Sequence, residues 1–218
     1  MRLHALARSQ IHKRKPKGSG HERPGEILDA AQRLVLRDGI GSVTMRAIAA
    51  EIGVSSTALY VYFPTREAIL LALCDRTLGK LLVRFGAIEA GPGTHLEKLR
   101  TFMANYVAFG QAHPDEYRLV FEVKSQGIGP MSHLAEPTPA AGNVGPQLFG
   151  KLLDQVKRLI AEGTFADHDP VTAAETIWML GHGMIMLTTS MPHFPWKDPA
   201  VAVAATTDLA LSGLLKRR

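Results

Sequence analysis

Apolar residues recur along most of this chain with the spacing of α-helices, and this periodicity constrains the fold more than any other feature. In the first such segment Ile27, Ala31, Leu34 and Val35 fall at positions i, i+4, i+7 and i+8, on one face of a helix. The sequence lacks a convincing apolar–polar alternation of the kind that half-buried β-strands show. It therefore predicts an all-α protein of about nine helices.

Capping residues divide the N-terminal part of the chain into short helices. Thr44 and Ser55 suit helix starts, because their hydroxyls can accept hydrogen bonds from the free backbone amides of the first turn. Gly53 ends the helix that begins at Thr44, and Pro64 follows the helix that begins at Ser55. Thr65 then opens a longer helix.

The rest of the chain shows similar start signals. They are a Thr94-x-x-Glu97 capping box, His113–Pro114, Asp169–Pro170 and Asp198–Pro199. Residues 127–146 are rich in Gly, Pro and Ala and predict a loop of about twenty residues, which is long for a compact domain. A helix is predicted to follow over residues 147–161.

Positive charge is concentrated at the N-terminus. The chain carries a net charge of +5, yet seven Arg and Lys residues in 1–23 are opposed there only by Glu22. Residues 1–23 therefore predict a flexible basic arm, which either binds DNA phosphates or is simply a solvated tail. We divide the rest into an N-terminal helical domain (24–64) and a C-terminal helical domain (65–218).

Composition predicts a cytoplasmic protein and gives no sign of catalysis. The single cysteine, Cys74, rules out an intramolecular disulfide and reads as a small core residue. The longest apolar stretch, 177–191, is too short to span a bilayer, and the basic N-terminus lacks the apolar region of a signal peptide. Metal-ligand spacing, a Gly-rich phosphate loop and a nucleophile elbow are all missing from the sequence. We therefore expect no enzyme activity, cofactor or metal.

Residues 44–63 carry the functional signal, because two short helices separated by a glycine turn have the spacing of a helix-turn-helix. The second helix, Ser55 to Tyr62, starts with small hydroxyl side chains that suit a crowded DNA groove. Leu59 is predicted to point into the core. By spacing alone, a plain three-helix bundle remains an alternative.

The run from Ile27 to Leu70 resembles the DNA-binding domain of the TetR family of transcriptional regulators. The first helix reads IL-AA--L, and the segment from Leu59 to Leu70 reads LYVYFPTREAIL, which is similar to the family's LY-YF--KE-L signature. The resemblance implies a homodimeric repressor that binds a palindromic operator in double-stranded DNA. The DNA contacts that it implies are Thr44, Arg46, Ser55, Ser56, Thr57, Ala58, Tyr60, Tyr62 and Arg66.

The C-terminal half looks like the TetR branch whose regulatory domain is named for a Trp-His-Gly pattern, here Trp178, His182 and Gly183. Such a domain implies a small-molecule effector, and aromatic and methionine side chains suit an adaptable apolar cavity. Each candidate also fits an ordinary core position. The predicted effector-pocket residues are Phe102, Met103, Tyr106, Phe109, Phe121, Trp178, Met179, His182 and Met186.

The last two helices are apolar on more than one face, which predicts that they have more than one packing partner. A homodimer interface formed by these helices would satisfy that requirement, although burial within one monomer is the alternative. A helical DNA-binding protein of architectural type, without effector-dependent release, remains the alternative function.

Overall fold

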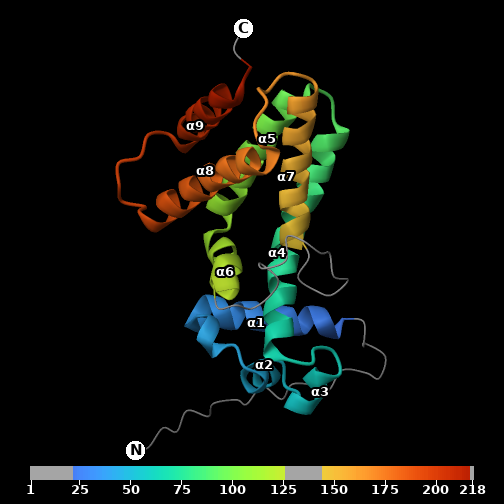
Figure 1. The fold of residues 1–218 in the computed structure, drawn as a ribbon. Helices are drawn as coiled ribbons and strands as arrows, with labels where there is room; N and C mark the ends of the chain where they lie inside the picture. Colours follow the sequence, from blue (N-terminus) through green and yellow to red (C-terminus); the bar gives the residue numbers. More distant parts are fainter. Residues whose placement is uncertain (1–21, 126–143, 217–218) are drawn as a thin grey trace, which may run out of the picture. The chain divides into compact units, whose positions relative to one another are not determined.

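The computed structural model describes residues 22–125 and 144–216, and Figure 1 labels the helices that they form. These residues form nine α-helices and one short 3-10 helix, so the predicted all-α class and the number of helices are confirmed. No helix among them is long and apolar enough to cross a membrane. The basic arm, except for its last two residues, and most of the predicted loop lie outside the described residues.

The described residues fall into two compact units, divided between Ile69 and Leu70. The N-terminal unit comprises α1 (Arg23–Asp38), the 3-10 helix η2 (Ile40–Ser42), α2 (Met45–Glu51), α3 (Ser56–Tyr60) and the first turn of α4 (Arg66–Ala90). Helix α1 packs on η2 and α2, and α2 packs on α3. The apolar face predicted for the first helix supplies its core, since Ile27 and Ala31 are fully buried.

The C-terminal unit contains the rest of α4 and five further helices. These are α5 (His95–Ala112), α6 (Pro114–Ser125), α7 (Val144–Ala161), α8 (Pro170–Ser190) and α9 (Pro199–Leu214). Helix α5 packs against each of the other four, and α8 lies between α7 and α9 in the packing order. Figure 1 shows α5 and α8 crossing, with α9 lying beyond α8.

Helices that the sequence predicted to begin at a capping side chain do begin there. Thr94 and Glu97 form the complete capping box, with a distance of 3.3 Å from the Glu97 amide to the Thr94 hydroxyl. The Asp169 carboxylate caps α8 by accepting a hydrogen bond of 2.8 Å from the Thr172 amide. These bonds satisfy amides that an uncapped helix end would leave without a partner.

Two predicted helix bounds were wrong. Helix α7 begins at Val144 rather than Gln147, so Gly145 and Pro146 lie in its first turn instead of the loop. Proline is tolerated in a first turn, because the amide that it lacks would have no helical partner there. Helix α3 ends at Tyr60 rather than Tyr62, and the chain continues in a turn in which the Phe63 amide bonds the Leu59 carbonyl.

Glycines allow α5 and α8 to approach closely. A Cβ atom on Gly110 would lie 2.6 Å from Ile185, and one on Gly181 would lie 2.7 Å from the terminal carbon of Met103. Both separations are shorter than packed carbon atoms allow. The two helix backbones therefore come closer here than larger residues would permit, and this brings Tyr106 of α5 within reach of Trp178 of α8.

Candidate DNA interface and apolar cavity

Both short helices of the helix-turn-helix begin at a capped residue. The Thr44 hydroxyl accepts a hydrogen bond of 3.0 Å from the Ala47 amide, and the Ser55 hydroxyl accepts one of 3.3 Å from the Ala58 amide. Between the helices Gly53 has a φ of 70°, a conformation that costs glycine little because it lacks a Cβ atom. The sequence therefore fixes the turn and both helix starts locally.

Burial separates the supporting residues of this element from those left to contact a ligand. Leu59 of α3 and Ile48 of α2 are fully buried, which holds α3 against the core of the N-terminal unit. Tyr60 is 53% exposed and Tyr62 37% exposed. Of the other predicted DNA contacts, Ser56 is half-buried, and the exposed ones are Thr44, Arg46, Ser55, Thr57 and Ala58.

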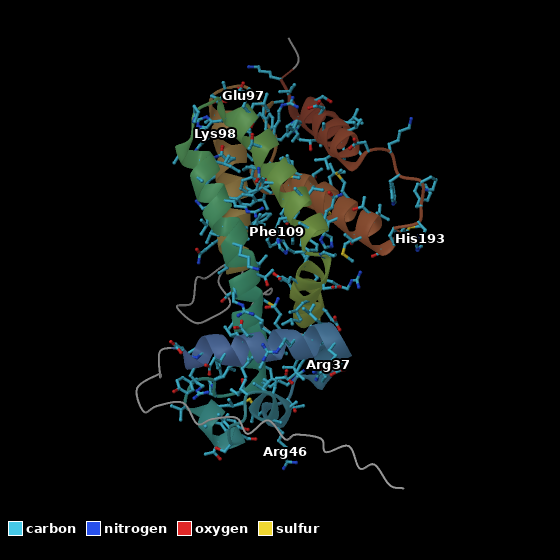
Figure 2. All side chains as sticks on the ribbon, turned by 180° about the vertical axis from the view of Figure 1, so that it is seen from behind. Arg37, Arg46, Glu97, Lys98, Phe109 and His193 are labelled. Carbon is cyan, nitrogen blue, oxygen red and sulfur yellow. The ribbon has the colours of Figure 1, made fainter. Side chains whose placement is uncertain are left out.

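Arg46 is the basic side chain of α2 and projects from the N-terminal unit (Figure 2). It is exposed, and among the described residues it has no hydrogen-bond or ion-pair partner. By contrast, Arg33 and Arg37 of α1 both pair with Glu51. A guanidinium without an internal partner is available to a phosphate oxygen, and it lies two residues from the N-cap Thr44.

Arg66 has an internal role that sequence reasoning missed. Its Nε donates to the Val43 carbonyl at 2.6 Å, and its Nη2 donates to the Ile40 carbonyl at 2.9 Å. A third contact of 3.5 Å joins Nη1 to the Glu67 carboxylate. Arg66 therefore fastens the segment that leads from η2 into α2 to the first turn of α4.

We expect Arg66→Ala to destabilise the N-terminal unit by about 2 kcal/mol, because two backbone carbonyls lose a charged donor. Urea denaturation followed by circular dichroism measures this loss. Arg66→Lys is expected to recover only part of it, since an ammonium lacks the planar fork that reaches both carbonyls. Unchanged stability of the alanine variant, with a weaker salt dependence of DNA binding, would instead make Arg66 a phosphate contact.

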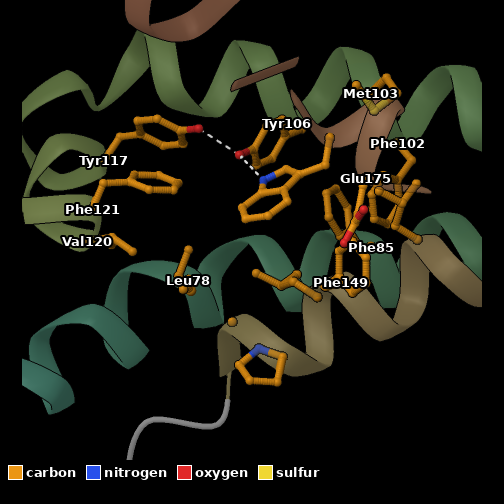
Figure 3. A pocket seen from close by; sticks show the side chains of 15 residues that line it. Leu78, Phe85, Phe102, Met103, Tyr106, Tyr117, Val120, Phe121, Phe149 and Glu175 are labelled. Atoms are coloured by element: carbon orange, nitrogen blue, oxygen red, sulfur yellow. Dashed lines mark hydrogen bonds between the residues drawn. The ribbon is translucent and has the colours of Figure 1, made fainter. Parts of the chain in front are cut away.

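The C-terminal unit contains a partly open cavity of about 130 Å³, shown in Figure 3. Five helices, α4 to α8, contribute its walls, which are almost entirely apolar or aromatic. The lining residues are Leu78, Phe85, Phe102, Met103, Tyr106, Tyr117, Val120, Phe121, Gly145, Pro146, Leu148, Phe149, Leu152, Glu175 and Trp178.

The cavity brings together part of the predicted effector set, namely Phe102, Met103, Tyr106, Phe121 and Trp178. The other four predicted residues do not line it. Phe109 is fully buried elsewhere, Met179 is 61% exposed, and Met186 is half-buried. His182 lies behind the wall, where it contacts Tyr117 and Phe121.

Sequence reasoning missed the contributions of α4 and α7 to the cavity. Phe85 of α4 stacks on Phe102, with ring centroids 3.4 Å apart, and Phe149 of α7 meets Trp178 edge-on at 5.8 Å. Nothing local marks these side chains as cavity residues rather than core. Glu175 had a usable signal, because it precedes Trp178 by three residues and so shares its helix face.

A hydrogen-bond chain runs along one wall of the cavity. The indole nitrogen of Trp178 donates to the Tyr106 hydroxyl at 3.0 Å, and the hydroxyls of Tyr106 and Tyr117 are 2.6 Å apart. The Tyr117 hydroxyl lies 2.7 Å from Nδ1 of His182. Figure 3 shows the first two of these bonds.

The chain consists of neutral groups. Burial raises the pKa of Tyr106 to about 12 and also raises the pKa of Tyr117, so neither phenol ionises near neutral pH. Burial also lowers the pKa of His182, which favours the neutral imidazole. If the neutral His182 accepts at Nδ1, every donor in the chain has a partner. The Trp178 indole then donates to Tyr106, Tyr106 donates to Tyr117, and Tyr117 donates to His182.

A capped helix-turn-helix followed by a separate helical unit defines the class of helix-turn-helix transcriptional regulators. Residues 27–73 match the family described as bacterial regulatory proteins, tetR family. Residues 99–211, about half of the chain, match the domain described as tetracyclin repressor-like, C-terminal domain. The chain belongs to the TetR family of DNA-binding transcriptional regulators, which are not enzymes.

Curated relatives are similar over different shares of their length. The nucleoid occlusion factor SlmA of Edwardsiella ictaluri is 27% identical over 168 residues, which cover 73% of this chain and 79% of that protein. The regulator EthR of Mycolicibacterium smegmatis is 29% identical over 47% of this chain and 48% of its own length. The match to YerO of Bacillus subtilis, at 32% identity, covers 32% of this chain and 24% of that protein.

Solved structures share the fold at low sequence identity. PfmR, a TetR family transcriptional regulator from Thermus thermophilus, superposes with a TM-score of 0.63 at 21% identity, covering 87% of this chain and 99% of that one. FadR, a fatty acid degradation regulator from Bacillus halodurans, gives 0.65 at 19% identity, covering 93% and 100%. KstR2, a ketosteroid transcriptional regulator of Mycobacterium tuberculosis, gives 0.61 at 21% identity, covering 89% and 96%.

Proposed function

We propose that this regulator is a homodimeric repressor that leaves a palindromic operator when a small, largely apolar effector fills the cavity of its C-terminal unit. The observation that carries the proposal is the cavity itself: the described part of its wall is apolar apart from Glu175 and the polar tips of the hydrogen-bond chain. Such a cavity with a few fixed polar groups is the usual form of a small-molecule site. Two proteins with a similar fold, the fatty acid degradation regulator FadR and the ketosteroid regulator KstR2, support an apolar class of effector.

Helix α4 supports a coupling between effector binding and operator binding. Its first turn carries Arg66, which fastens the segment before α2, while Leu78 and Phe85 line the cavity. Arg66 and Leu78 are twelve residues apart, or about 18 Å along a helix. An effector that displaces α4 thereby changes the spacing of the two recognition helices, which successive major grooves require to be about 34 Å.

The dimer proposal is supported by apolar side chains left exposed on the last two helices. Leu187 of α8 is 53% exposed, while Val201 and Leu209 of α9 are 61% and 75% exposed. Large apolar side chains that gather on neighbouring helices commonly mark an interaction surface. A two-fold dimer also matches the symmetry of a palindromic operator.

We expect Leu209→Asp to shift the protein from dimer to monomer, with at least a tenfold weaker association, because a buried, unpaired carboxylate opposes the interface. Sedimentation-velocity ultracentrifugation over a range of concentrations measures the shift. Leu36→Asp on α1, where the leucine is 52% exposed, is the matched control and should remain dimeric. Equal association of both variants would place the interface elsewhere.

Release is tested by adding octan-1-ol to a preformed complex of the protein with its labelled operator. The proposal predicts that the anisotropy of the DNA falls as octanol binds, with operator affinity reduced about 5- to 150-fold, the usual range of allosteric coupling. An unchanged operator affinity at saturating octanol would reject apolar release.

An architectural DNA-binding protein without effector release is the second candidate. The similarity to the nucleoid occlusion factor SlmA, over 73% of this chain, favours it. Such a protein would bind DNA equally well with its cavity empty or filled. The same octanol titration therefore separates the two functions.

A further inference from the structure

Among the described residues that line the cavity, Glu175 is the one with a charged side chain. It lies on α8, three residues before Trp178, so the two side chains share the helix face that meets the cavity. The side chain is half-buried, and Figure 3 shows it among the rings around the cavity. A carboxylate in this position needs either solvent or a partner of opposite charge.

No protein partner serves Glu175 within residues 22–125 and 144–216, where neither a hydrogen bond nor an ion pair engages its carboxylate. The remaining polar atoms of the wall are arranged differently. The indole of Trp178 and the hydroxyls of Tyr106 and Tyr117 bond one another and His182. The carboxylate is therefore the cavity group whose negative charge a ligand would have to balance with a positive one.

Aromatic rings surround the same space. Phe85 and Phe102 form a stacked pair, and Phe149 and Trp178 form an edge-on pair. The faces of aromatic rings attract cations, and this attraction increases where water is excluded. A cationic ligand would be attracted both by the carboxylate and by the faces of the rings, whereas the carboxylate would repel an anion.

We propose that the effector is an apolar molecule with one cationic nitrogen, such as an alkylammonium, and that Glu175 is its counter-charge. This inference rests on the proposed role of the cavity as the effector site and adds the charge of the ligand. It differs from the anionic ligand that a fatty acid would supply. An acid would bring a second carboxylate next to Glu175, and its desolvation would gain no partner there.

The preferred charge of the ligand is tested by measuring the binding of three eight-carbon probes to the full-length chain. The probes are octylammonium, octan-1-ol and octanoate. We expect isothermal titration calorimetry at pH 7 to show octylammonium binding about tenfold more tightly than octanol, with octanoate weakest. Glu175→Gln should remove the preference for the ammonium and leave octanol affinity within about twofold, which also shows that the variant is folded. The matched control is Asp154→Asn, an exposed acid on α7 that also loses one negative charge.

The outcomes separate this inference from the proposed function. Equal binding of octylammonium and octanol, tighter binding of octanoate, or an ammonium preference that survives Glu175→Gln would overturn the cationic class while keeping an apolar effector site. An equal loss in Asp154→Asn would show a general effect of protein charge and would also overturn it. Failure of all three probes to bind would overturn the effector role of the cavity.

Discussion

Replacing Arg46 by glutamate is expected to weaken operator binding about a hundredfold. Arg46 is the exposed basic residue of α2, and no described residue pairs with it. Its replacement by alanine should weaken binding about tenfold and lower the salt slope of log K by about 2 for a dimer, since each lost phosphate contact contributes about 0.9. The reversal adds repulsion between each glutamate and the DNA backbone.

Fluorescence anisotropy of labelled operator DNA at several salt concentrations measures both the affinity and its slope. Lys157→Glu is the matched control, because Lys157 is also exposed and lies on α7, outside the helix-turn-helix. We expect the control to bind nearly as tightly as the unmodified protein. A normal salt slope in Arg46→Ala would remove this residue from the phosphate contacts.

Filling the cavity is expected to give a regulator that binds DNA but no longer responds to its effector. Val120 is 2% exposed and lines the cavity, so a phenylalanine at this position occupies part of the roughly 130 Å³ that a ligand would fill. We expect Val120→Phe to weaken octylammonium binding by about a hundredfold, as a lost burial of several methylene groups implies. Operator affinity without effector should stay within about threefold, because the helix-turn-helix is a separate unit.

Calorimetry and operator anisotropy on the same preparation measure the two affinities. Val83→Phe makes the same change on α4 at a side chain that is 75% exposed and outside the cavity wall, and it should bind the probe normally. Normal octylammonium binding by Val120→Phe would show that the ligand lies elsewhere. A parallel loss in Val83→Phe would point to a general effect of the added ring.

Sequence reasoning succeeded for the helix-turn-helix because its signals are local. Thr44, Gly53 and Ser55 act on amides and backbone angles within a few residues, and the structure has both caps and the positive φ. Leu59 also lies in the core, as predicted. The predicted start of α7 was wrong because it also rested on a local signal. Pro146 favours a loop, yet it is compatible with the first turn of a helix.

The cavity depends on contacts between distant segments, and these have no local signature. Residues of α4 and α7 line it beside residues of α8, so its shape follows from helix packing rather than from any one motif. The sequence therefore identified only some of the aromatic residues that line the cavity, and it missed Phe85 and Phe149. Arg66 illustrates the same point, because its partners Ile40 and Val43 lie more than twenty residues away.

The most direct test of a dimeric, operator-specific regulator is an anisotropy titration against labelled DNA from upstream of its own gene. The titration is run at two salt concentrations with unlabelled non-specific competitor. The account predicts tight binding that resists the competitor, with two protomers bound per two-fold symmetric site. Weak binding that is equal on any duplex and is lost on a modest increase in salt would contradict it.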